Sequence, residues 1–371
     1  MNYKLNLKDT SPLHFQIRRD LEEKITNGQL RPGDQIASNN VLAQKYKVSL
    51  ITVKKAVASL IESGLLFSRI GKGTYVADKA QSRMSIKKQK NIGIVLRDIK
   101  HPFFSMILHS IEERAFELNY NILLSNSGGK IQKEESIIKR FQEMDVDGLI
   151  IASLSLQYRA TPLIQKLHNE NFPYIMISYM HDPEYWYIGS DHELGGYMAT
   201  QYLLKIGYDK IGYVHLGSGN LLSEVRKNGY YRALMEHNID YKNERIFHLD
   251  TENFDSGANR YQLGYKFGIK FSKLKKRPEA LFFYTDVAAL GFIQAVTGKG
   301  MKVPDDVAVI GYDDVEMSAY AATPLTTVRQ PTDKIGMKAV EIIRDRIEGK
   351  EIGNRTIFKP TLVIRKSCGT N

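Results

Sequence analysis

The chain has 371 residues, of which 43% are hydrophobic and 25% are charged, and it contains one cysteine, Cys368. This length allows two or three domains that each bury a core of their own. A single cysteine cannot form an intramolecular disulfide, and the sequence has neither a signal peptide nor an apolar run approaching the roughly 20 residues of a membrane span. We therefore expect a cytoplasmic protein that is not associated with a membrane.

The positive charge is concentrated near the N-terminus. Residues 1–90 contain 17 Lys or Arg and 7 Asp or Glu, which is +10 of the total net charge of +11. A basic balance confined to one small segment suggests that this segment binds a polyanion, whereas a nearly neutral remainder argues against a membrane surface. A solvated basic face is the alternative interpretation of the same charge.

Two helices are predicted first along the chain. The first spans residues 12–27, and its apolar face recurs every four residues at Leu13, Ile17, Leu21 and Ile25. The second begins after Ser38, a favourable N-cap residue, and ends near Lys47. Its apolar face is formed by Val41, Leu42 and Tyr46.

A third helix follows after about three residues, capped by Ser49 and closed by Gly64. Its buried stripe should consist of Val53, Val57, Leu60 and Ile61. The side chains left to face outward near its start are Ser49, Leu50, Thr52, Lys54 and Lys55. Two short helices in this order match the helix-turn-helix geometry, in which the second helix lies in the major groove of DNA.

Two short β runs, at residues 65–69 and 74–76, flank Ile70-Gly71-Lys72-Gly73. Glycines accept positive φ, so this hairpin can bring backbone N–H groups and Lys72 close to a phosphate, as the wing of a winged helix does. A small basic helical domain with a surface hairpin is the alternative. The residues predicted to contact DNA are Asn40, Ser49, Leu50, Thr52, Lys54, Lys55, Gly71, Lys72 and Gly73.

Residues 10–77 resemble the winged helix-turn-helix of the GntR family of bacterial transcription regulators. The motifs that carry the resemblance are Pro12-Leu13-His14-Phe15-Gln16-Ile17, Leu30-Arg31-Pro32-Gly33-Asp34, Leu42-Ala43, Thr52-Val53-Lys54 and Gly71-Lys72-Gly73-Thr74. Leu50 and Lys54 depart from the family, which usually has Arg at both positions. Because Leu50 can meet a thymine methyl group but cannot hydrogen-bond a guanine edge, the resemblance does not imply the family's operator sequences.

Residues 78–90 have the composition of a linker and separate a domain at 1–77 from a larger one at 91–371. In the larger domain, apolar β runs alternate with helices, which predicts an α/β fold with parallel sheets that are covered on both faces. The runs are residues 92–96, 121–125, 148–152, 174–178, 210–215, 280–284 and 307–312.

Residues 90–366 resemble the effector domain of the LacI/GalR family. The resemblance rests on an ordered series of motifs that includes Ile92-Gly93-Ile94-Val95-Leu96, His101-Pro102-Phe103-Phe104, Arg226-Lys227-Asn228-Gly229-Tyr230, Val309-Ile310-Gly311-Tyr312-Asp313 and Val328-Arg329-Gln330-Pro331. It implies a periplasmic-binding-protein-like core of two α/β subdomains joined by three crossovers, with a ligand in the cleft between them. A GntR-type reader on such a sensor is similar to the arabinose-type repressors of bacteria.

Open α/β sheets bind ligands beyond the carboxyl ends of their strands, so residues just after each β run are the candidates for an effector site. At or just after the ends of these runs lie Asp98, Ala152, Ser178, Thr285 and Asp313. Phe103, Phe104 and Arg226 complete the set of candidates on other grounds. The resemblance implies that Arg226 and Asp313 grip the effector, and Phe103 or Phe104 would supply an apolar wall for a sugar. We expect Asp286 to cap the helix that it precedes.

These features together predict a homodimeric repressor of carbohydrate-utilisation genes that binds a palindromic double-stranded operator and is released by a small sugar. One alternative is the opposite linkage, in which a corepressor such as a purine holds the protein on DNA. The other is a sugar-modifying enzyme, although no pair of acid and base emerges. No catalytic residue and no cofactor are predicted. No metal site is predicted either, since the nine histidines are scattered singly along the sequence.

The affinity for DNA should fall steeply with salt, because basic side chains displace condensed counterions from the phosphates. The contributing lysines are Lys4, Lys8, Lys54, Lys55 and Lys72. For two copies we expect roughly six to ten phosphate contacts and a slope of log affinity against log salt near −0.9 times that count. Fluorescence anisotropy on a labelled duplex over a salt series measures the slope, and a value near zero would contradict DNA binding.

Overall fold

A computed structural model describes residues 12–69, 72–77, 90–153, 158–217, 220–240, 245–249 and 259–369. The chain divides into two compact units, Met1–Gln89 and Lys90–Asn371. Gly71, the arm lysines Lys4 and Lys8, and nearly all of the predicted linker lie outside the described residues. Within the described ranges, no helix combines the length and the apolar character that crossing a bilayer requires.

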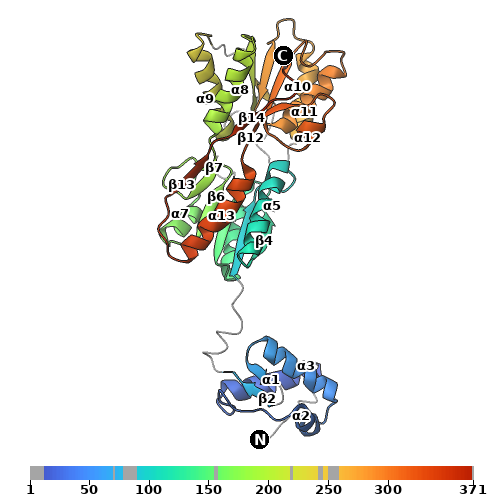
Figure 1. Ribbon diagram of the computed structural model, residues 1–371, viewed down its shortest axis with the longest axis vertical. Helices are drawn as coiled ribbons and strands as arrows, with labels where there is room; N and C mark the ends of the chain where they lie inside the picture. The colour runs from blue at the N-terminus through green and yellow to red at the C-terminus, as the bar shows by residue number, and fades with distance from the viewer. Residues whose placement is uncertain are drawn as a thin grey trace. The chain divides into compact units, whose positions relative to one another are not determined.

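The described part of the first unit contains three helices and a β hairpin in the predicted order (Figure 1). The elements are α1 (Leu13–Thr26), α2 (Asn39–Tyr46), α3 (Leu50–Glu62), β1 (Leu66–Arg69) and β2 (Gly73–Val76). Both predicted N-caps are confirmed, because the Ser38 hydroxyl accepts the Val41 N–H and the Ser49 hydroxyl accepts the Thr52 N–H. The core of this unit joins all three helices to the hairpin.

The prediction that Ile61 belongs to the buried stripe of α3 was wrong, and two other apolar residues of the predicted helix faces, Leu13 and Val41, are exposed as well. Leu13 is 43% exposed, Val41 39% and Ile61 36%. Ile61 follows the buried Leu60, and a step of one residue turns a helix by about 100°, away from the core. Ala56 lies on the buried face of α3 instead.

The second unit consists of two lobes, each built around a six-stranded sheet (Figure 1). The N-lobe contains β3 (Lys90–Leu96), α5 (Pro102–Glu117), β4 (Tyr120–Asn126), α6 (Ile131–Glu143), β5 (Gly148–Ile151), α7 (Pro162–Asn169), β6 (Tyr174–Ile177), β7 (Tyr187–Ser190), α13 (Thr332–Ile347) and β13 (Arg355–Phe358). The C-lobe contains α8 (His192–Lys205), β8 (Ile211–Leu216), α9 (Leu221–Glu236), β9 (Ile246–Leu249), α10 (Arg260–Phe271), β10 (Ala280–Phe283), α11 (Asp286–Thr297), β11 (Ala308–Asp313), α12 (Met317–Tyr320), β12 (Thr326–Arg329) and β14 (Thr361–Val363).

The strand orders are β13-β7-β6-β5-β3-β4 in the N-lobe and β14-β12-β11-β10-β8-β9 in the C-lobe. All neighbours are parallel except β12 and β14, which pair antiparallel. The chain passes between the lobes three times, after β7, after β12 and after β13, which confirms the predicted crossovers. The sequence missed β7, β9, β12, β13 and β14, which are short and contain polar residues or are only three residues long. The equally short β5, β6 and β10 were found because each belongs to a continuous apolar run.

Helices α8 and α9 touch through their backbones at two glycines. A Cβ atom on Gly196 would lie 2.0 Å from the Arg226 carbonyl oxygen, and one on Gly229 would lie 2.0 Å from the Glu193 carbonyl oxygen. No side chain fits into such a contact. The two glycines therefore set how closely the start of α8 approaches the first turns of α9, which carry Arg226.

Replacing Gly229 by Ala should lower the free energy of unfolding by about 1–3 kcal/mol, because α9 must move away from α8 to admit the methyl group. Gly353→Ala is the matched control, since Gly353 has nothing within 4 Å of an added Cβ and its φ is not positive. Urea denaturation followed by circular dichroism compares the two variants. Equal stability of both would contradict backbone contact between these helices.

Candidate functional site

The predicted DNA-contacting side chains of α3 lie on its outer face. Ser49, Leu50, Lys54 and Lys55 are exposed, and Thr52 is half-buried. The Thr52 and Ser49 hydroxyl oxygens lie 2.8 Å apart, so the N-cap holds Thr52 in place. Asn40 is also exposed, in the first turn of α2. Apart from Leu50 and the half-buried Thr52, these residues offer exposed polar or basic side chains.

The tip of the hairpin is held by two side chains that bind the same carbonyl. The Lys72 carbonyl oxygen accepts hydrogen bonds from Gln35 Nε2 at 2.8 Å and from the Tyr75 hydroxyl at 2.9 Å. Gly73 has φ +112°, and a Cβ there would overlap Gln35 Nε2. The Lys72 carbonyl is thus held in place while the Lys72 side chain stays exposed.

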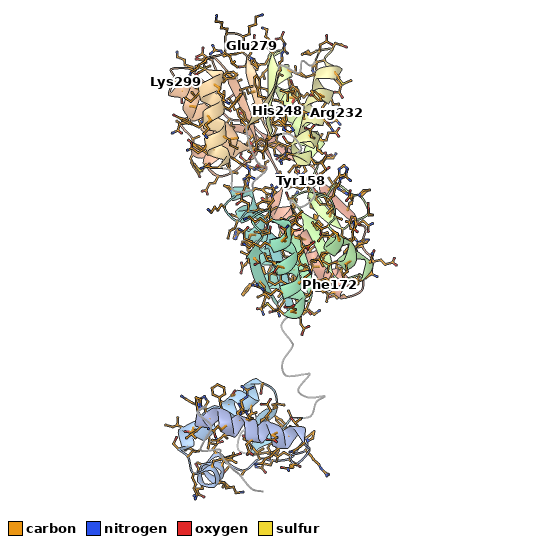
Figure 2. All side chains as sticks on the ribbon, turned by 180° about the vertical axis from the view of Figure 1, so that it is seen from behind. Tyr158, Phe172, Arg232, His248, Glu279 and Lys299 are labelled. Carbon is orange, nitrogen blue, oxygen red and sulfur yellow. The ribbon has the colours of Figure 1, made fainter. Side chains whose placement is uncertain are left out.

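In the second unit, polar residues gather where the carboxyl ends of the two sheets meet. The strand orders reverse between β3 and β5 and between β8 and β10, and such switch points are where open α/β sheets bind ligands. Asp98 follows β3, and it accepts a hydrogen bond from Arg260 of the other lobe at 3.1 Å. Tyr158, which follows β5, lies at the junction of the lobes (Figure 2) and packs on Leu222 of α9.

Arg226 lies at the centre of the C-lobe part of this site. Its guanidinium carbon is 3.6 Å from the centre of the Tyr312 ring, and one nitrogen donates to the Tyr284 carbonyl. A second nitrogen lies 3.6 Å from the Asp313 carboxylate and 3.4 Å from His192 Nδ1. The side chain is only 4% exposed. Arg226 therefore connects α9, β11 and the first crossover.

The Asp313 carboxylate is bound by three side chains. It accepts hydrogen bonds from Thr285 Oγ1 at 2.8 Å and from Gln330 Nε2 at 2.7 Å, in addition to the ion pair with Arg226. Burial raises its pKa, and these three partners oppose the shift. Its φ is +112°, a conformation that non-glycine residues rarely adopt and that costs about 1–3 kcal/mol. The surrounding network holds Asp313 in this strained position.

The structure connects most of the remaining predicted residues to this site. The Ser178 carbonyl accepts a hydrogen bond from His192 Nε2 at 2.9 Å, so Ser178 joins Arg226 through that histidine. Phe103 and Phe104 are buried in the first turn of α5, beside His101. Ala152 offers only a buried methyl group, which belongs to the same hydrophobic core as Phe103 and Phe104.

Several residues of the site were missed by the sequence analysis. They are Arg97, His101, Tyr158, His192, Arg260, Tyr284, Tyr312 and Gln330. Arg97 stands next to Asp98 after the first β run, which was a usable signal. Arg260 opens α10, far from any predicted strand end, and only the tertiary structure brings it to Asp98.

The prediction for Asp286 was wrong. The N-cap of α11 is Thr285, and Asp286 is the first residue of the helix, with its carboxylate turned into the C-lobe. It accepts hydrogen bonds from the Val315 N–H, the Ser318 hydroxyl and the Thr327 hydroxyl. Burial, and then the nearby Asp313, raise its pKa to about 7. Asp286 thus supports the strand end that carries Asp313.

Among the described residues, no group of three or more His, Cys, Asp or Glu side chains is placed to hold a metal ion. The site instead combines guanidinium groups, carboxylates and aromatic rings. Such groups suit a ligand with several hydroxyls, since they offer directional hydrogen bonds together with flat apolar faces.

His192, one of two buried histidines of the site, should make the free energy of unfolding depend on pH. Burial, and then the charge of Arg226, lower the pKa of His192 to about 3. The unfolded chain binds the proton below about pH 6.5, so the stability present above that pH is lost as the pH falls, by about 1.4 kcal/mol per unit. Urea midpoints at pH 7 and pH 5 should differ less in His192→Gln than in the parent chain. His109→Gln, at an exposed position of α5, should keep the full difference; an unchanged difference in His192→Gln would contradict a neutral buried His192.

Comparison with known proteins agrees with both units. Residues 13–76 match the model of the bacterial regulatory proteins of the gntR family, and residues 200–368 match the periplasmic binding protein-like domain. The HTH-type transcriptional repressor PurR of Aliivibrio salmonicida is 31% identical over 296 residues, which cover 79% of this chain and 86% of that protein.

Two further relatives extend the similarity. The arabinose metabolism transcriptional repressor of Geobacillus stearothermophilus is 27% identical over 367 residues, covering 96% of this chain and 98% of that protein. A LacI family transcriptional regulator from Enterococcus faecium, solved with bound ribose, superposes with a TM-score of 0.64 at 25% identity, over 75% of this chain and 98% of that one. The chain belongs to the bacterial transcriptional repressors that join a GntR-type DNA-binding domain to a LacI-type, periplasmic-binding-protein-like effector domain.

Proposed function

We propose that this protein is a homodimeric, cytoplasmic repressor whose hold on a palindromic operator is released when a small carbohydrate binds between the two lobes. The main support is the buried network of Arg226, Asp313, Thr285 and Gln330, which contacts segments next to two of the three crossovers. Arg226 Nε and Gln330 Oε1 are buried and have no hydrogen-bond partner among the described residues. Unsatisfied polar atoms of this kind are what a hydroxylated ligand would pair with.

The relatives support a carbohydrate as the ligand class. One is an arabinose metabolism repressor that aligns with nearly the whole chain, and another was solved with ribose. The relatives named here are transcriptional regulators, and we propose no catalytic role for the site. We assign the contacts with DNA to Asn40, Ser49, Leu50, Thr52, Lys54, Lys55, Lys72 and Gly73, together with Gly71.

The network also suggests how a ligand could act at a distance. His192 opens α8 directly after the first crossover, and Gln330 follows β12 at the second. A ligand that forms hydrogen bonds with Arg226 or Asp313 competes with the hydrogen bonds that these residues make to His192 and Gln330. Binding therefore changes the contacts that position the two connecting segments. If one relative orientation of the lobes binds the ligand better, binding shifts the protein toward that orientation. Release from the operator then requires only that DNA favours the other orientation.

Arg226→Ala and Asp313→Ala should each lower the affinity for the releasing sugar by about 2–4 kcal/mol, because a hydroxyl loses its charged partner. Both variants should still bind the operator, so they should repress without being induced. Calorimetry with a panel of pentoses and hexoses, and anisotropy on a duplex selected from random DNA, measure the two affinities.

Two variants control for structural damage. Thr285→Val removes one donor to Asp313 without leaving a buried charge unpaired, and it should show a smaller loss of the same kind. Lys210→Ala removes a partner of Glu279 at the amino end of β8, away from the site, and it should be induced normally. Sugar affinity that is unchanged in Arg226→Ala and Asp313→Ala would place the effector elsewhere.

A further inference from the structure

Three arginines reach the site between the lobes, and two of them have carboxylate partners. Arg226 pairs with Asp313, and Arg260 pairs with Asp98. Arg97 follows β3 and has no carboxylate partner among the described residues. Its guanidinium donates to the Tyr158 hydroxyl at 2.7 Å, and it lies over the rings of Phe104, at 5.3 Å, and Tyr158, at 5.4 Å.

Arg97 is nevertheless buried. The residue is 9% exposed, and its Nε is buried without a hydrogen-bond partner in the described part of the chain. Withdrawing a guanidinium from water without a counter-charge is unfavourable, and two ring faces and one hydroxyl offset this cost only in part. An anionic group of a bound ligand would supply the counter-charge that the Arg97 guanidinium lacks.

All three arginines lie near enough to His101 to affect its charge. His101 lies at the start of α5, and its side chain caps that helix by accepting the Phe103 N–H. Its pKa is lowered well below the usual value, first by burial and then by the positive charges of Arg260, Arg97 and Arg226. The positive charges of three guanidinium groups, which come from both lobes, thus all lower the pKa of His101.

We propose, on the basis of the function proposed above, that the effector is an anionic carbohydrate whose negative group is bound by Arg97. A sugar acid fits best, because a carboxylate carries a single charge and matches the planar donor fork of one guanidinium. The rings of Phe104 and Tyr158 flank this position and can border the sugar ring. The paired arginines and aspartates bind the hydroxyls.

The experiment compares neutral sugars with their charged derivatives on the full-length protein by calorimetry. The pairs are glucose with glucuronate and gluconate, galactose with galacturonate, glucose with glucose 6-phosphate, and ribose with ribose 5-phosphate. At least one carboxylate should bind 100-fold or more tightly than its neutral parent, and it should release the protein from its operator. Tighter binding of the sugar phosphates than of the sugar acids would support an anion site at Arg97 but would contradict a carboxylate as its ligand.

Variants of Arg97 test whether this residue causes the preference for charged sugars over neutral ones. Arg97→Gln should weaken binding of the anion about 10- to 100-fold and leave the affinity for the neutral parent nearly unchanged, and Arg97→Lys should restore part of the loss. Arg346→Gln is the matched control. Arg346 also has a buried Nε without a partner among the described residues, and its guanidinium lies 3.4 Å from the Trp186 ring, outside the site between the lobes. Its loss should not change the affinity for either ligand.

Two results would overturn the inference of an anionic effector. Only the second of them would also count against the proposed function. Tight binding and operator release by a neutral sugar, with no effect of Arg97→Gln, would show an uncharged effector and leave the proposed function intact. Release by none of the panel, neutral or charged, would count against a carbohydrate effector altogether, and therefore against the proposed function as well.

Discussion

The Arg226–Asp313 ion pair is the interaction on which the rest of the sensor depends. Both partners are almost completely buried, and two buried charges are tolerated only when each is paired and hydrogen-bonded. The fold meets this requirement with elements that are far apart in the sequence. Thr285 and Gln330 donate hydrogen bonds to the Asp313 carboxylate. The Arg226 guanidinium donates to the Tyr284 carbonyl and lies over the Tyr312 ring. The backbone strain at Asp313 persists because so many partners hold it.

The same pair links the site to the parts of the chain that connect the lobes. Glycine contacts between α8 and α9 bring Arg226 to His192, which follows the first crossover, and Asp313 binds Gln330 at the second. The ion pair between Asp98 and Arg260 adds a direct contact from one lobe to the other. A ligand at this place competes for hydrogen bonds that also position the connecting segments, so binding and lobe orientation are coupled through one network.

Much of the fold could be predicted, because long apolar strands and capped helices are local features. Ser38 and Ser49 could be identified as caps from their neighbours alone, whereas Ile61 and Asp286 were misassigned, since burial and hydrogen bonding there depend on packing. For the site, the rule that ligands bind at the carboxyl ends of strands found Asp98, Thr285 and Asp313. It could not find Arg260, whose partner lies 162 residues away in the sequence, nor show that Arg97 is buried without a carboxylate partner among the described residues.

Hydrogen exchange of the backbone amides, with and without the releasing ligand, tests the central claim most directly. If the ligand binds at the Arg226–Asp313 network, protection should increase in segments of both lobes, at residues 97–104 and 178–179 and at residues 222–230, 284–289 and 313–315. The segment 346–354, which lines a surface pocket of the N-lobe beside Trp186, should exchange as before. Protection confined to that pocket, or to one lobe, would contradict a ligand held between the lobes.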